Sequence, residues 1–66
     1  SMDGGGIDVW LGSDPKRQTD AVICTVDLDR GDAEMKLMVG CSEEEKAYIE
    51  DFYNSWPKMG AQIIRR

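Results

Sequence analysis

Two segments of alternating apolar residues, separated by a short polar turn, constrain this chain more than any other feature of its sequence. Apolar side chains recur at every second position over residues 21–29 and again over residues 33–39, and this is the period of a half-buried β-strand. Between them, Arg30 and Gly31 supply a turn in which the glycine can adopt the positive φ that tight hairpins require. The sequence therefore predicts an antiparallel β-hairpin.

The alternation also predicts the register of this hairpin. If the loop contains only Arg30 and Gly31, Val22 lies opposite Val39, and every pair on the same face is apolar, whereas a one-residue slip would turn one strand's apolar side chains outward. We expect this face to pack against a helix. It would consist of Val22, Cys24, Val26, Leu28, Ala33, Met35, Leu37 and Val39.

A shorter alternating segment, residues 7–11, predicts a third strand. We expect it to run antiparallel beside the segment 21–29, with Leu11 opposite Val22, because this pairing keeps its aliphatic side chains on the same face as those of the hairpin.

The second face of the predicted sheet carries a smaller apolar patch. One helix cannot cover both faces, so this patch is either exposed, as partner-binding surfaces are, or covered by the C-terminal segment. It is the predicted protein-interaction site and consists of Trp10, Ile23 and Met38, with Asp8 and Lys36 at its rim.

The segment after the hairpin has the pattern of an amphipathic helix. Ser42 and Glu45 form a capping box, and Pro57 disfavours helical geometry at Trp56, where the helix should end. Between these limits, large apolar residues form a stripe at helical spacing. The stripe consists of Tyr48, Ile49, Phe52, Tyr53 and Trp56.

These segments together predict an α+β fold, a three-stranded antiparallel β-meander packed on one C-terminal α-helix. Residues 61–65 are apolar and partly β-branched, and they form either a short fourth strand or a segment lying across the sheet. Residues 1–6 have the composition of a tag and flexible glycine spacer, so a single small domain spans residues 7–66. A chain of 66 residues can bury only one small core.

The sequence offers little chemistry for catalysis. It contains no histidine, the commonest general base, and its two cysteines cannot alone complete a structural zinc site. In the predicted register, Cys24 and Cys41 are roughly 13 Å apart, whereas a disulfide requires less than about 7 Å. We therefore predict no catalytic, metal or cofactor site.

The net charge of the chain indicates which classes of partner it can bind. Thirteen acidic against eight basic residues give a net charge of −5, which disfavours binding to phosphate backbones. No apolar run is long enough for a membrane span or a signal peptide, so we expect a cytoplasmic protein. The leading hypothesis is a small non-catalytic interaction or regulatory module. It would bind another protein, or a second copy of itself, through an open sheet face or a sheet edge.

A nucleic-acid-associated module is the alternative. Over residues 7–56, the predicted order of three strands and a helix resembles in topology the plant ethylene-response DNA-binding domains and the arm-binding domains of recombinases. That resemblance implies DNA binding by the sheet, which the acidic residues oppose. An acidic nucleic-acid mimic, inhibiting a DNA- or RNA-binding protein, is a variant of this alternative.

Overall fold

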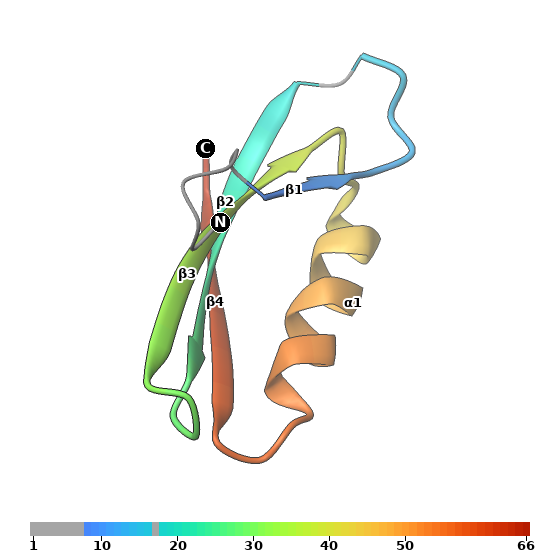
Figure 1. Cartoon of the computed structure of the whole chain (residues 1–66). Coiled ribbons are helices and arrows are strands. Elements are labelled where there is room, and N and C mark those ends of the chain that lie inside the picture. The colour runs from blue at the N-terminus through green and yellow to red at the C-terminus, as the bar shows by residue number, and fades with distance from the viewer. Residues whose placement is uncertain (1–7, 17) are drawn as a thin grey trace.

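The computed structural model describes residues 8–16 and 18–66. A four-stranded sheet in the order β1-β3-β2-β4 carries one helix on one face, so the predicted α+β class is confirmed (Figure 1). The predicted spacer, Ile7 and Arg17 lie outside the described residues. The elements are β1 (Val9–Leu11), β2 (Thr19–Asp27), β3 (Asp32–Val39), α1 (Glu43–Asn54) and β4 (Met59–Arg65).

The antiparallel hairpin of β2 and β3 is confirmed, but its predicted register is wrong by two residues. Val22 lies opposite Leu37 rather than Val39. The loop is longer than predicted because Asp27 pairs with Asp32 and its carboxylate accepts a hydrogen bond from the Arg30 N–H at 3.2 Å. A shift of two residues preserves the alternation, so the same side chains still share a face.

The predicted position of the first strand is wrong. Strand β1 pairs with β3 in parallel, with Trp10 opposite Met38, because β4 occupies the edge of β2 instead. The fourth strand that the sequence left open is therefore present, and its seven residues offer more backbone hydrogen bonds than the three of β1. The mixed sheet is not a three-stranded meander, so the topological resemblance to DNA-binding domains is lost.

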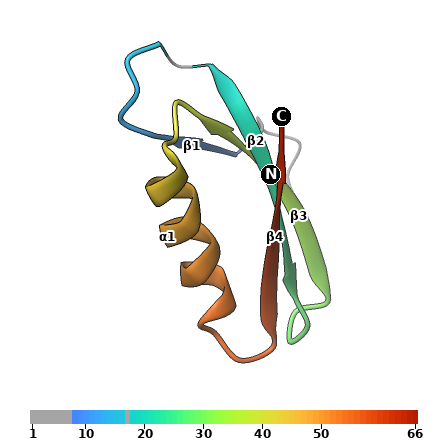
Figure 2. The same cartoon turned by 180° about the vertical axis from the view of Figure 1, so that it is seen from behind.

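The face that the helix covers is the opposite of the predicted one. Strands β3 and β4 are both antiparallel to β2, so they run in the same direction and α1 is a crossover between them (Figures 1 and 2). Such crossovers are right-handed in about 98% of cases, and the strand order thus selects one face for the helix. On the uncovered face, Met35 is 72% exposed.

The core beneath α1 is small. Its buried apolar residues come from three strands, the helix and the turn before it, and among the described residues only Ile23 and Met38 are completely buried. The core consists of Ala21, Ile23, Met38, Cys41, Ile49 and Ile63.

Both ends of α1 are fixed by side chains. The predicted capping box of Ser42 and Glu45 is present. The helix ends at Asn54, two residues before the predicted end. The Asn54 amide donates to the Ala61 carbonyl at 3.2 Å and accepts from the Ala61 N–H at 3.0 Å, which ties α1 to β4. Within the described residues, no helix has the length and apolar character needed to cross a membrane.

The two faces of β3 can be distinguished by a matched pair of substitutions. We expect Met38→Ala to lower the free energy of unfolding by about 2–5 kcal/mol, because truncating a buried methionine leaves a cavity. Met35→Ala, on the opposite face of the same strand, should change it by less than about 0.5 kcal/mol in dilute solution. Urea denaturation measures both values, and equal losses would contradict this assignment of the faces.

Candidate functional site

The uncovered side of the sheet is an exposed apolar surface that spans all four strands. We call it the open face. Its exposed side chains include Leu11, Met35 and Ile64, which are 64%, 72% and 59% exposed. By strand register it consists of Val9, Leu11, Thr19, Val22, Cys24, Val26, Ala33, Met35, Leu37, Val39, Gln62 and Ile64.

The centre of the open face is an aliphatic row that crosses all four strands. Val9 pairs with Leu37, Leu37 with Val22, and Val22 with Ile64. Because paired residues on adjacent strands have neighbouring side chains, these four form a continuous apolar strip. We call it the central row.

Charged side chains do not interrupt the open face. Thr19 and Gln62 are polar side chains among its residues, and neither carries a charge. At one end of the sheet, Asp20 and Arg66 are held by the backbone, since the Asp20 carboxylate accepts from the Cys41 N–H at 2.7 Å and the Arg66 guanidinium donates to the Thr19 carbonyl at 2.8 Å. The face therefore suits an apolar partner rather than a charged one.

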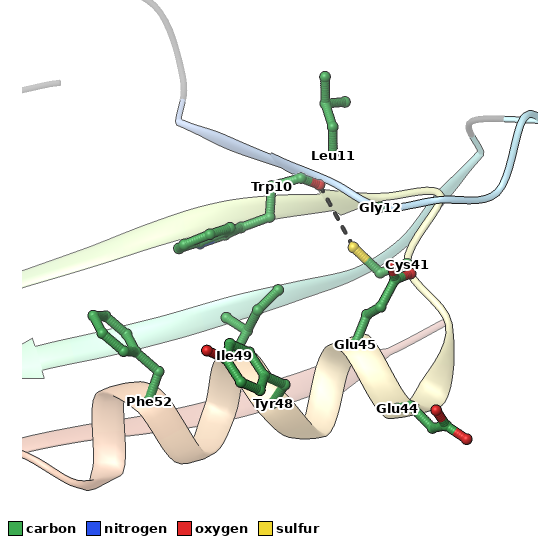
Figure 3. A pocket seen from close by; sticks show the side chains of 9 residues that line it. All are labelled: Trp10, Leu11, Gly12, Cys41, Glu44, Glu45, Tyr48, Ile49 and Phe52. Atoms are coloured by element: carbon green, nitrogen blue, oxygen red, sulfur yellow. Dashed lines mark hydrogen bonds between the residues drawn. The ribbon is translucent and has the colours of Figure 1, made fainter.

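The second surface is a groove of about 510 Å³ between α1 and β1, which we call the aromatic groove (Figure 3). Tyr48 and Phe52 project from α1 on the side of Trp10, and they are 76% and 46% exposed. Apolar grooves of this size hold small ligands or the side chains of a partner. The lining residues are Trp10, Leu11, Gly12, Cys41, Glu44, Glu45, Tyr48, Ile49 and Phe52.

The sequence analysis grouped these aromatic side chains in one apolar stripe and did not separate the exposed ones from the buried ones. Of that stripe, Ile49 is buried and Tyr53 packs partly against the core. Tyr48, Phe52 and Trp56 are exposed. The spacing of these residues could have predicted the difference in exposure. Positions four apart lie along one side of a helix, so Tyr48, Phe52 and Trp56 form one line of the predicted helix, beside the line of Ile49 and Tyr53 that faces the sheet.

Glu45 joins the groove's two walls. Its carboxylate accepts from the Ser42 N–H at 2.8 Å and from the Ser13 N–H at 3.2 Å, so it connects the helix start to the loop after β1. These backbone hydrogen bonds, from Ser42 and then Ser13, lower the pKa of Glu45. The carboxylate is therefore a structural anion rather than a proton donor.

Cys41 lies in the wall of the same groove, but it is a poor nucleophile. Burial raises the pKa of its thiol, and the nearby carboxylates of Glu45 and Asp20 raise it further. Because the thiolate is the reactive species, the side chain stays protonated and unreactive at neutral pH. Both cysteines are free, and Cys24 is the more exposed of the two.

The residues predicted as the interaction site lie mainly on the covered face. Ile23 and Met38 are 0% exposed beneath α1, and the Trp10 ring packs edge-on against Tyr53 with centroids 6.3 Å apart. The expectation that this row forms an exposed patch is therefore wrong for Ile23 and Met38. The crossover placed the helix over them.

Lys36 and Asp8, the other two predicted site residues, form an ion pair. The buried Lys36 ammonium donates to the Asp8 carboxylate at 2.7 Å and to Glu34 at 3.1 Å. Burial disfavours its charge, but the hydrogen bonds to Asp8 and Glu34 outweigh burial and raise the pKa of Lys36. The same hydrogen bond lowers the pKa of Asp8. These charges satisfy one another.

The described part of the chain contains no group of three or more cysteine, aspartate or glutamate side chains placed to hold a metal ion. Compared with known proteins, the chain matches no protein-family model, no curated protein and no solved structure. Its geometry is therefore the basis for assigning a function.

The ion pair of Lys36 and Asp8 should make the stability of the fold depend on pH in the acid range. Because the pKa of Asp8 lies below its ordinary value of 3.8 in the folded state, its contribution to stability is present above that value and is lost as pH falls through the folded pKa. Lys36→Met should raise the pKa of Asp8 toward 3.8 in an NMR titration.

The control for this titration is Lys58→Met, which removes an exposed lysine 3.4 Å from Asp29. It should leave the pKa of Asp8 unchanged. An equal response of Asp8 to both variants would mean that general charge, not the Lys36 hydrogen bond, lowers the pKa.

A substitution at Gly12 should lower the stability of the fold, because the chain after β1 passes close to the turn before α1. A Cβ at position 12 would lie against the Gly40 carbonyl oxygen and 2.5 Å from the Cys41 Cα. We expect Gly12→Ala to lower the free energy of unfolding by about 1–3 kcal/mol and to increase amide exchange in β1.

Gly60→Ala is the matched control, since the nearest atom to its new Cβ is the Asn54 Oδ1 at an ordinary 3.8 Å. Hydrogen exchange followed by NMR compares the two variants. Unchanged protection of β1 in Gly12→Ala would show that the close approach is relieved without loss of this strand.

Proposed function

We propose that this protein is a non-catalytic interaction module that binds another protein, or a second copy of itself, through its open face. The observation that carries the proposal is that one face of a four-stranded sheet is apolar and uncovered. Contiguous apolar surface of this kind is uncommon on monomeric proteins and is typical of protein interfaces.

The sequence of β2 supports this use of the face. Val22 and Cys24 point to the open face, whereas Ala21 and Ile23 are buried beneath α1. A continuous apolar run is the pattern of strands that are buried on both faces. The described chain supplies a cover for one of them, so a binding partner is the natural cover for the other.

The open face fits a protein partner better than the aromatic groove does. The groove depends on β1, which has three residues, and part of its lining already serves the core, where Ile49 is buried. The open face extends across all four strands, and the hollow of about 280 Å³ beside Val22 and Ile64 is smaller than the aromatic groove. Broad surfaces of this kind bind other proteins.

Binding by addition of a partner's strand to a sheet edge is less well supported than binding on the open face. The Asn54 amide occupies the backbone N–H and C=O of Ala61 on β4, which blocks part of that edge as edge strands are commonly protected. The other edge, β1, is short. Binding by the face therefore has more apolar area available than binding by an edge.

The ionisable groups support a non-catalytic role. The pKa values of Asp8 and Glu43 are lowered by hydrogen bonds from lysine or arginine partners. The pKa of Glu45 is lowered by its role as a helix cap. Each of these shifts arises from a structural contact, either within α1 and its N-cap, as for Glu43 with Lys46 and Glu45 with Ser42, or between elements, as for Glu43 with Arg65, and such contacts also perturb pKa values in proteins without catalysis.

Site-specific photo-crosslinking tests the proposal. With p-benzoylphenylalanine in place of Met35, on the open face, we expect discrete protein adducts in an extract of the source organism. Ile64→Lys in the same chain should remove them, because a charge on the face must be desolvated on binding. The probe in place of Tyr48, which is 76% exposed on α1, is the control.

Two results would contradict the proposal. One is the absence of adducts from position 35. The other is an adduct pattern from position 35 that matches the pattern from position 48 and survives Ile64→Lys, since this would show collision rather than a defined interface.

A further inference from the structure

We infer that the occupant of the open face is a second copy of this chain, packed sheet against sheet. The assembly would have four layers, with the two sheets inside and one helix on each outer side. This inference rests on the proposed function, because it names the partner for the same surface.

The central row makes the open face complementary to itself. Val9, Leu37, Val22 and Ile64 lie side by side across the sheet. A two-fold axis that lies between the sheets along this row brings each copy's row against the other's. Aliphatic side chains then meet aliphatic side chains, as the inner faces of packed sheets require.

The distribution of charge permits this pairing in spite of the net charge of −5. The first turn of α1 carries Glu43, Glu44 and Glu45, and α1 lies on the far side of the sheet (Figure 2). In the four-layer arrangement, layers about 10 Å apart place each helix roughly 20 Å from the facing sheet. That distance exceeds the screening length of about 8 Å at physiological salt.

The absence of charge on the open face favours a second copy over other proteins of stated chemistry. A basic or acidic partner would find no opposite charge among the face's residues, where the polar side chains of Thr19 and Gln62 are uncharged. An uncharged apolar face buries without leaving charges unpaired. Every other copy of this chain carries such a face, so a matching partner is present wherever the protein is.

A dimer of this chain requires about one sixth of its exposed surface. The molecule exposes 4817 Å², and a standard interface takes about 800 Å² from each partner. The open face spans all four strands and presents Leu11, Met35 and Ile64 at 64%, 72% and 59% exposure, so its apolar side chains can contribute to this share.

The small core gives the second copy a role in stability. Two residues, Ile23 and Met38, are completely buried in the described chain, and domains of this size commonly depend on disulfides, metals or oligomerisation. Cys24 and Cys41 are free. Covering the open face would add a second apolar layer to the sheet.

Light scattering and sedimentation of the purified chain across a concentration series test the inference. We expect the mass to rise from 7.4 kDa to twice that value. Ile64→Lys, in the central row, should raise the dissociation constant by about tenfold or more. This variant lowers the net negative charge, so a weaker dimer cannot be attributed to the overall negative charge of the chain.

Tyr48→Lys is the matched control. It makes the same change of charge at a side chain that is 76% exposed on α1, and it should leave the dissociation constant unchanged. Met35→Lys, at a 72% exposed position of the open face, is a second face variant if Ile64→Lys fails to fold. Circular dichroism establishes the fold of each.

Cys24 provides a native probe of the same surface, because it lies beside the central row, next to Met35 on β3 and Gln62 on β4. In the wild type, its reaction with a maleimide should slow severalfold as protein concentration rises. In Ile64→Lys it should keep the dilute rate at every concentration. Cys41, with 6% exposure, reacts slowly in all variants.

The outcomes separate this inference from the proposed function. A wild-type monomer at all concentrations, with an unchanged Cys24 rate, overturns the second copy, while adducts from position 35 to a different protein would leave the proposed function standing. A dimer that persists in both face variants and is lost in Tyr48→Lys also overturns the second copy on the open face, since it assembles through the helix side, and the adducts from position 35 then decide the proposed function.

Discussion

The crossover from β3 through α1 to β4 is the constraint on which the rest of this structure depends. Because β2 lies between two strands that run in the same direction, the single helix must lie on the face that a right-handed crossover selects. That face becomes the core, with Ile23 and Met38 completely buried. The other face remains apolar and uncovered, and both the proposed function and the proposed dimer follow from this asymmetry.

Polar interactions fix the parts that the small core cannot hold by itself. Glu45 caps α1 and binds the Ser13 N–H in the loop after β1, Asn54 ties the end of α1 to β4, and Lys36 joins β3 to Asp8 beside β1. All these contacts lie in loops, at element ends or on the helix side. These charged side chains therefore lie away from the open face. For this reason a chain with a net negative charge can still have an apolar surface.

Local patterns predicted local structure well. The period of two gave the hairpin and the sets of side chains that share each face, and Ser42 with Glu45 gave the start of α1. The register was wrong because the Asp27 carboxylate holds the Arg30 N–H and lengthens the loop, a contact that composition does not reveal. The position of β1 was wrong because the pairing of β4 with β2 joins segments far apart in the chain.

The candidate site shows the same division. The alternation of apolar residues predicted that Val22, Cys24, Met35 and Leu37 share one apolar face. The sequence by itself determined this face, the capping box, the net charge and the absence of histidine. The tertiary structure alone decided which face the helix covers, which edge β1 joins and which helical aromatics stay exposed. The physical reason is that side-chain periodicity specifies which residues lie together, whereas crossover handedness and competition between strands for an edge are properties of the whole sheet.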